Sequence, residues 1–147
     1  MPLGVGGRVA LRCRLAVDER AFDLYSVHFQ HGGMAGDSRV VAAERLLGAI
    51  AARASVPAVV AGDLNCRPGS RELDLLLGPL RSAHVVVHGL EPESTVMPVS
   101  RGFVLDYILV SEGVEVVDAR VAFDEAGPAG LTASDHLGLV ARVRLVG

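Results

Sequence analysis

The segment 8–17 carries the pattern that most constrains the fold, because apolar side chains alternate there with arginine and alanine. Positions 9, 11, 13, 15 and 17 are apolar, and the positions between them hold arginine or alanine. A period of two is typical of a β-strand that buries one face. A polar turn at 18–20 and a second strand pattern over 22–30 predict an antiparallel hairpin. The chain is therefore expected to build a sheet, whose apolar face requires a second layer.

Helical and strand patterns alternate through the rest of the chain. Asp37 or Ser38 is the candidate cap of a first helix, on which Arg39, Glu44 and Arg53 are expected to be solvated. We expect helices over 37–54 and 70–78, strands over 57–61, 83–88, 103–111, 114–123 and 137–146, and a loop that contains 127–130. This order indicates an α/β (α+β) fold in a single domain over residues 1–147.

Composition limits the classes of function. Half of the 147 residues are hydrophobic, so the chain has ample apolar surface to bury and disorder is excluded. The net charge of −3 and the aromatic content of 4% argue against a basic, base-stacking surface for nucleic acid. All fourteen basic residues are arginine, so lysine Schiff-base and P-loop chemistry are excluded. A phosphate substrate bound through a metal ion stays open.

Cysteine content and hydropathy indicate a cytoplasmic protein. Cys13 and Cys66 are too few for a disulfide framework and are expected to be reduced thiols. Arg8, Arg12 and Arg14 interrupt the apolar residues of the amino terminus, so a signal peptide is not expected. No apolar run approaches the ~20 residues that a membrane-spanning helix needs, so no membrane span is expected.

Polar side chains recur where the predicted strands end. They lie near the end of the second strand, follow the third strand, interrupt the apolar run 103–110 and precede the last strand. These residues are His28, Asp63, Asn65, Asp106, Asp135 and His136. Sheet proteins place their functional sites at strand ends and in the loops beyond them. Asp106 is the most informative residue, because a carboxylate inside an apolar strand requires a partner and the imidazole of His136 would serve.

Each of these residues also has a purely structural interpretation. A single histidine on a strand, such as His28, is more often a hydrogen-bonded structural residue, and Asp63 would serve as the cap of a turn. Asp135 and His136 would serve as a cap of the last strand. Taken singly, His28 and Asp63 favour the structural interpretation, whereas the whole set around one sheet edge favours a site.

The chemistry of this set suits metal-assisted hydrolysis of a phosphate ester. Carboxylates and an asparagine amide oxygen are suitable ligands for a hard cation such as Mg²⁺, which polarises a phosphoryl oxygen. A histidine paired with a buried aspartate is held in one tautomer, and its protonated form is stabilised. Zinc is disfavoured, because the cysteines and histidines lack the spacing of a zinc cluster.

Four short motifs occur in an order that resembles the endonuclease/exonuclease/phosphatase superfamily, whose fold is of the deoxyribonuclease-I type. The motifs are Ser26-Val27-His28-Phe29, Gly62-Asp63-Leu64-Asn65, Leu105-Asp106-Tyr107-Ile108-Leu109-Val110-Ser111 and Ser134-Asp135-His136. Each motif is short, and their order makes the resemblance specific. The helix between the first two motifs and the apolar strand around Asp106 add to it. The resemblance extends from about residue 7 to residue 145.

The resemblance implies catalytic roles for five residues. His28 would contact the phosphate and assist the leaving group. Asp63 would orient or activate the attacking water, or bind the metal, and Asn65 would hold that water or a phosphate oxygen. Asp106 would orient His136, which would stabilise the pentacovalent transition state.

The resemblance also implies a metal site and a phosphate contact. Asp135 would bind the metal, together with Asp63 in its alternative role. Mg²⁺ is the expected ion and Mn²⁺ a possible substitute. Arg67 is a candidate substrate-binding residue, because a guanidinium group suits phosphate oxygens, although a solvated arginine is the default interpretation.

The resemblance further implies a four-layer αββα sandwich, of which this chain would be the carboxy-terminal portion. The amino-terminal half of the family domain supplies an early asparagine and a metal-binding glutamate. Glu19, Glu44 and Glu72 lie in other contexts, and Val104 stands where the family usually has an arginine. We therefore expect a truncated domain with an exposed apolar sheet face, which would self-associate or bind a partner.

Three hypotheses of function follow. The first is a metal-dependent phosphodiesterase, nuclease or phosphatase, acting on nucleic acid, a phospholipid head group or a phosphoinositide. The second is a catalytically inactive remnant of the same fold, or a binding or interaction module that lacks the metal-binding glutamate. The third is a small α/β domain with accidental motif matches, which predicts that Asp63, Asp106, Asp135 and His136 do not converge.

Overall fold

The computed structural model describes residues 1–3, 8–123, 125 and 131–146, and the loop expected at 127–130 lies outside this set. The strands are β1 (Ala10–Val17), β2 (Arg20–His28), β3 (Ala58–Asp63), β4 (Arg81–Ser82), β5 (Asp106–Val110), β6 (Val114–Ala122) and β7 (Gly138–Leu145). The helices are α1 (Gly36–Ala51), α2 (Arg71–Leu77) and α3 (Ala83–His88), and a 3₁₀ turn covers Val99–Arg101. These elements confirm the expected mixed α/β class.

Five strands form a mixed sheet in the order β1-β2-β3-β5-β4. β1 and β2 pair antiparallel, as the alternating pattern predicts, whereas β2 and β3 pair parallel. A parallel pair needs a crossover connection, which α1 supplies here. β5 then pairs antiparallel with β3 on one side and with β4 on the other. The remaining strands, β6 and β7, form an antiparallel sheet of their own.

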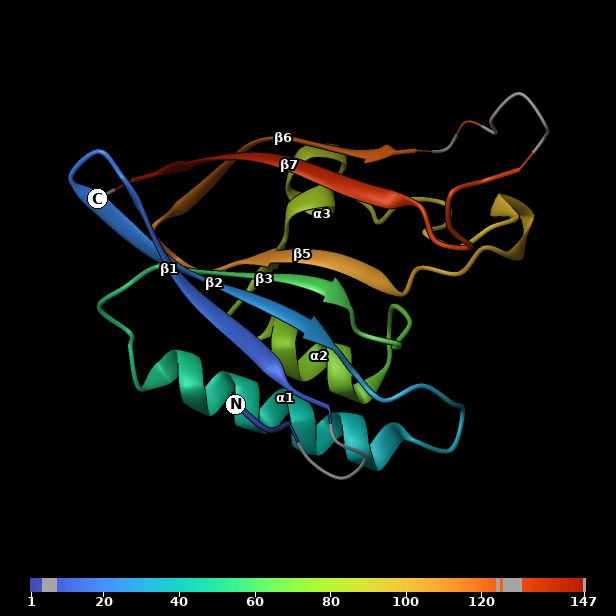
Figure 1. The fold of residues 1–147 in the computed structure, drawn as a ribbon, viewed down its shortest axis with the longest axis horizontal. Helices are drawn as coiled ribbons and strands as arrows, with labels where there is room; N and C mark the ends of the chain where they lie inside the picture. Colours follow the sequence, from blue (N-terminus) through green and yellow to red (C-terminus); the bar gives the residue numbers. More distant parts are fainter. Residues whose placement is uncertain (4–7, 124, 126–130, 147) are drawn as a thin grey trace.

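The two faces of the five-stranded sheet carry separate apolar clusters. α1 and α2 cover one face (Figure 1), where Tyr25, Leu46 and Leu73 are buried together. On the opposite face, Val59 and Val110 pack with residues of β6 and β7. The middle strands of the five-stranded sheet are thus covered by helices on one face and by the two-stranded sheet on the other. None of the helices in the described part of the chain combines the length and apolar character needed to cross a membrane.

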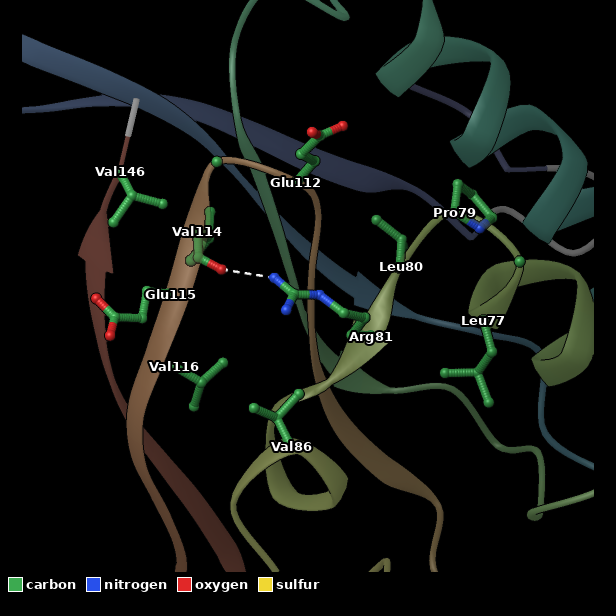
Figure 2. Close-up of a pocket in the computed structure, with 12 residues that line it drawn as sticks. Leu77, Pro79, Leu80, Arg81, Val86, Glu112, Val114, Glu115, Val116 and Val146 are labelled. Atoms are coloured by element: carbon green, nitrogen blue, oxygen red, sulfur yellow. Dashed lines mark hydrogen bonds between the residues drawn. The ribbon is translucent and has the colours of Figure 1, made fainter. Parts of the chain in front are cut away.

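Arg81 links the two sheets at the end of the molecule where β5 runs into β6. A hollow of ≈ 550 Å³ lies there between α2, β4 and β6 (Figure 2). The Arg81 guanidinium extends into it and donates to the carbonyl of Val114 over 2.8 Å. Apolar side chains such as Leu80 and Val116 line the same hollow. The bond joins the edge strand β4 to the beginning of β6.

The predicted strand over 83–88 is wrong, because this segment forms the helix α3. Its run of valines favours a strand, but both ends carry helix signals. The hydroxyl of Ser82 accepts from the backbone N–H of Val85, and Gly89 ends the helix with a left-handed conformation at φ 79°. These caps outweigh the weak strand preference of the valines.

The expected solvation of Arg39 is also wrong. Its side chain is buried against α2, where the guanidinium Nε donates to Glu72 Oε1 over 2.6 Å. A buried arginine requires such a partner. By contrast, Glu44 is exposed as expected.

Candidate active site

The register of three neighbouring strands places His28, Asp63 and Asp106 in one row. His28 at the end of β2 pairs with Asp63 at the end of β3, and Asp63 pairs with Asp106 at the start of β5. Side chains of residues directly opposite each other project from the same face of a sheet. The row lies at the edge where β2 and β3 end (Figure 1). The sheet itself therefore brings an imidazole and two carboxylates together.

His136 reaches this row from the loop before β7. Its Nδ1 lies 2.8 Å from Oδ2 of Asp106, which is the pairing that the sequence predicts. The ligand atoms of Asp63, Asp106 and His136 all lie within 4.8 Å of one another. All three side chains are half-buried. The site therefore combines residues from β3, β5 and a loop in a single cluster.

A buried segment around Thr95 holds the Asp106 and His136 segments together. The Thr95 hydroxyl accepts from the backbone N–H groups of Leu105 and Asp106 over 3.0 and 3.2 Å. The Thr95 carbonyl accepts from Leu137 N over 2.8 Å. Val96 forms an isolated β-bridge with His136. Thr95 therefore hydrogen-bonds to the backbone of the segment that carries Asp106 and to the backbone next to His136.

The turn after β3 gives Asp63 a fixed orientation. Asn65 has a left-handed backbone at φ 49°, which asparagine tolerates better than most residues. Its backbone N–H donates to Asp63 Oδ1 over 2.7 Å, and its side-chain Nδ2 donates to Asp63 Oδ2 over 3.1 Å. His28 Nε2 lies 3.5 Å from the same Oδ2. Both oxygens of Asp63 thus have defined partners.

Burial and neighbouring charges shift two ionisation equilibria in the cluster. Burial raises the pKa of Asp63, and the negative charge of Asp106 adds to this shift. Burial of the His136 imidazole opposes protonation. The hydrogen bond that His136 donates to Asp106 and the charges of Asp106, Asp63 and Asp135 outweigh the effect of burial and raise the pKa of His136. The cluster therefore contains a carboxylate with increased basicity and an imidazole that favours its charged form.

The cluster opens into a cleft of ≈ 730 Å³ that carries basic groups around its acidic residues. Arg8 and Arg101 line this cleft, and the Arg8 guanidinium donates to Nδ1 of His28 over 3.2 Å. Arg67 also lines it, with its guanidinium 3.7 Å from the centre of the Phe103 ring. These cations surround the cleft although the whole chain carries a net charge of −3.

Asp135 is exposed and lines the cleft, but it is not one of the three clustered residues. The third hypothesis predicts that these residues do not converge, and the three-residue cluster argues against it.

The donor set of the cluster fits a divalent metal ion. Asp63 and Asp106 provide carboxylate oxygens, which Mg²⁺ and Mn²⁺ both accept. His136 provides an imidazole, although its Nδ1 is already bonded to Asp106. Glu72 is unsuited to this site, because it is paired with Arg39. Within the described residues, no glutamate belongs to the cluster.

Two side chains with a place in the site were missed by sequence reasoning. His31 lies in the loop after β2, and its Nδ1 is 3.2 Å from Oδ1 of Asn65. Arg8 reaches His28 from a position before β1. Both residues have contacts that are 20 or more positions distant in the chain, so no local pattern marks them. The sequence signal that could have indicated them is their position, since His31 directly follows the predicted strand 22–30 and Arg8 begins the predicted strand 8–17.

Comparison with known proteins gives one family and several similar structures. Residues 3–136 match the model of the Endonuclease/Exonuclease/phosphatase family. The catalytic domain of human Nocturnin with a bound sulfate anion is 25% identical with a TM-score of 0.79, and the match covers 95% of this chain and 54% of that one. A search of curated protein sequences gave no match.

Two further solved structures share the fold. A functionally unknown conserved protein from Enterococcus faecalis V583 is 22% identical with a TM-score of 0.83, covering 99% of this chain and 59% of that one. D. rerio TDP2 complexed with a single-strand DNA product is 15% identical with a TM-score of 0.73, covering 94% of this chain and 62% of that one. The chain thus spans 54–62% of the length of these structures.

Proposed function

This chain belongs to the endonuclease/exonuclease/phosphatase family, and from that premise we propose that it acts in metal-dependent hydrolysis of a phosphate ester. The observation that carries the proposal is the cluster of Asp63, Asp106 and His136, whose ligand atoms lie within 4.8 Å of one another. In this cluster the hydrogen-bonded Asp106–His136 pair offers a charged hydrogen-bond donor, and the neighbouring carboxylate of Asp63 offers a base. These are the groups that in-line attack of water on a phosphoryl group requires.

The residues of the cluster have complementary roles in this proposal. His136, held by Asp106 and favoured in its charged form, donates a hydrogen bond to the phosphoryl oxygen and stabilises the negative charge that develops there. Asp63 accepts a proton from the attacking water, and Asn65 fixes the orientation of its carboxylate. His28 contacts the phosphate from the neighbouring strand.

A divalent ion at the carboxylates would polarise the phosphoryl oxygen and offset the charge of the transition state. We propose Asp63 and Asp135 as its protein ligands, with Mg²⁺ as the ion and Mn²⁺ as an alternative. Asp63 thus has two alternative roles, as a base and as a metal ligand.

The proposed substrate is a phosphate ester, with nucleic acid, a phospholipid head group and a phosphoinositide as the candidate classes. Arg8, Arg67 and Arg101 around the cleft support an anionic substrate. Arg67 is the proposed phosphate contact among them. The acidic net charge of the chain does not oppose this proposal, because the local charge of the cleft is what an anion meets.

A second candidate function is a catalytically inactive remnant or a binding module of the same fold. Two observations favour it: the chain spans 54% of the matched Nocturnin domain, and no glutamate of the described residues joins the cluster. In either case we propose that the chain forms part of a four-layer αββα domain.

Hydrolysis of bis(4-nitrophenyl) phosphate by the purified chain tests the proposal. The reaction is measured with Mg²⁺, with Mn²⁺ and with a chelator, beside the double variant Asp63→Ala/His136→Ala. Metal-dependent turnover that the double variant lacks supports the phosphoesterase. Equal rates for both chains, with circular dichroism showing both folded, reject it and favour the inactive module.

A further inference from the structure

The loop after β2 is held in place by a buried ion pair that lies outside the catalytic cluster. Arg39 on α1 and Glu72 on α2 are both buried, and their charged groups approach to 2.6 Å. The second arm of the same guanidinium, Nη1, donates to the carbonyls of Gln30 and Gly32 over 3.2 and 2.8 Å. Arg39 therefore connects both helices to the backbone on either side of His31.

His31 in turn completes the hydrogen bonds of the Asn65 amide. Asn65 Nδ2 donates to the carbonyl of Phe29 over 3.1 Å, which identifies that atom as the nitrogen because a carbonyl only accepts. The other amide atom, Oδ1, lies 3.2 Å from His31 Nδ1. An amide oxygen only accepts, so Nδ1 of His31 carries a proton and donates to it.

The Asn65 amide thus has a partner on each side. Its nitrogen contacts Asp63, and its oxygen contacts His31. A rotation of the amide by half a turn would place its oxygen against Asp63 Oδ2 and its nitrogen against the N–H of His31. Both contacts would then be repulsive. The His31 contact therefore acts together with the contacts of Nδ2 to Phe29 and Asp63, and holds the amide in the orientation that presents an N–H to Asp63.

We propose that His31 is a positioning residue for Asn65 and Asp63, and that the Arg39–Glu72 pair is the anchor that keeps His31 there. The series of hydrogen bonds runs from Arg39 to the loop carbonyls, from His31 to Asn65, and from Asn65 to Asp63. Its catalytic consequence rests on the proposed function, whereas the orientation of the Asn65 amide does not.

Four variants test the proposal. His31→Ala removes the donor, and His31→Asn restores an N–H at nearly the position of Nδ1. Arg39→Lys keeps a charge opposite Glu72 but removes the fork that also reaches the two loop carbonyls. Arg53→Met is the matched control, because Arg53 lies beyond the other end of α1 and is exposed. Among the residues that the structure describes, its side chain donates only to the nearby carbonyl of Ala49.

The first readout is the mobility of the Asn65 side chain, measured as the ¹⁵N order parameter of its NH₂ group in each folded variant. His31→Ala and Arg39→Lys should lower this order parameter clearly, whereas His31→Asn and Arg53→Met should leave it at the wild-type value. An unchanged Asn65 amide in both His31→Ala and Arg39→Lys overturns the proposal.

The second readout is the hydrolysis of bis(4-nitrophenyl) phosphate. His31→Ala should lower kcat by about 10- to 100-fold, the range found when partners of metal-site ligands are removed, with little change in KM. His31→Asn should recover most of this loss. Loss of kcat without recovery by His31→Asn would overturn the proposal. If the wild-type chain shows no turnover while the Asn65 amide responds as expected, the phosphoesterase proposal fails and the positioning role stands.

Discussion

Asp106 and His136 show how one residue changes the chemistry of another in this molecule. They are 30 positions apart in the chain, and their side chains meet at 2.8 Å. The hydrogen bond and the surrounding carboxylates raise the pKa of His136 against the opposing effect of burial. Because the pKa of His136 is higher in the folded chain than in the unfolded chain, protonation of His136 stabilises the fold.

Replacement of Asp106 by Asn should therefore destabilise the chain in a pH-dependent manner. The stabilisation by the charged pair is fully present below the unfolded pKa of about 6.5 and is lost as the pH rises through the raised pKa of the folded chain. Urea unfolding at about pH 6 should show a loss of about 1 kcal/mol for Asp106→Asn. At about pH 9 the loss should be smaller.

The exposed Glu44→Gln variant removes one negative charge elsewhere and serves as the control for this measurement. An equal loss at both pH values for Asp106→Asn would contradict the ion-pair explanation. The chemical shifts of the His136 ring, followed against pH, should also show a lower pKa in this variant.

Side-chain contacts were predictable from the sequence where a single short segment carries the evidence for them. A carboxylate within an apolar strand predicted a partner for Asp106, and the structure provides His136. It failed for Arg39, because burial of that side chain depends on Glu72, which lies 33 positions away on another helix. His31 was missed for the same reason, since its partner Asn65 is 34 positions away.

At the scale of elements, the junction of β2 and β3 depends on a residue without a side chain. Gly62 has a φ of 143°, and a Cβ at this position would overlap the carbonyl oxygen of Val27 on the neighbouring strand. The close approach lies next to the His28–Asp63 pair of the same ladder. The two strand ends come together because position 62 is glycine.

Gly62→Ala should consequently destabilise the chain by about 3 kcal/mol or more, because the backbone conformation is strained for alanine and the strands must separate. Gly33→Ala is the matched control, since nothing lies within 4 Å of a Cβ at that position. Chemical denaturation of both variants measures the difference. Similar midpoints for the two variants would show that β2 and β3 tolerate the added methyl group.

The Thr95 segment is a second element on which the site depends. Thr95→Val keeps the shape of the side chain but leaves the backbone N–H groups of Leu105 and Asp106 without their acceptor. We expect a loss of about 2 kcal/mol in the free energy of unfolding. Thr95→Ser retains the hydroxyl and should lose less. A larger loss for Thr95→Ser than for Thr95→Val would refute the role given to the hydroxyl.

The order of the elements was largely predictable, because most of them have strong patterns of their own. The hairpin, α1, β3 and the last three strands follow apolar periods, and the structure contains each of them. α3 was predicted as a strand, because a short valine run carries no helical period and its caps are single residues. The pairing of β3 with β5 was not predictable from periodicity, since register depends on contacts between distant segments.

At the scale of the whole molecule, β1 presents an apolar face to solvent. It is the edge strand of the five-stranded sheet, and Leu11 and Val17 are 63% and 55% exposed. The partly buried Phe22 and Leu24 of β2 continue the same face. The two-stranded sheet covers the middle of the larger sheet and leaves this edge open. An apolar face on an edge strand favours association between molecules.

We predict that the isolated chain self-associates through this face. Sedimentation velocity over a range of concentrations should show association of the wild-type chain, and Leu11→Thr/Val17→Thr should reduce it. Met34→Ser removes a fully exposed apolar side chain away from β1 and serves as the control. Association that persists in the double variant but disappears in Met34→Ser would assign the contact to another surface.

Asp63 and Asp106 oppose each other on neighbouring strands, so an ion bound by both would be coupled to the sheet itself. If Asp106 held the ion with Asp63, in place of the Asp135 proposed above, the ion would act as a cross-link between β3 and β5, next to the ladder in which Val60 opposes Leu109. Its binding free energy would then appear as slower hydrogen exchange of the backbone amides in that ladder, because opening the strands would require release of the ion. By the same linkage, a substitution in the core that loosens β3 from β5 would weaken metal affinity without touching a ligand.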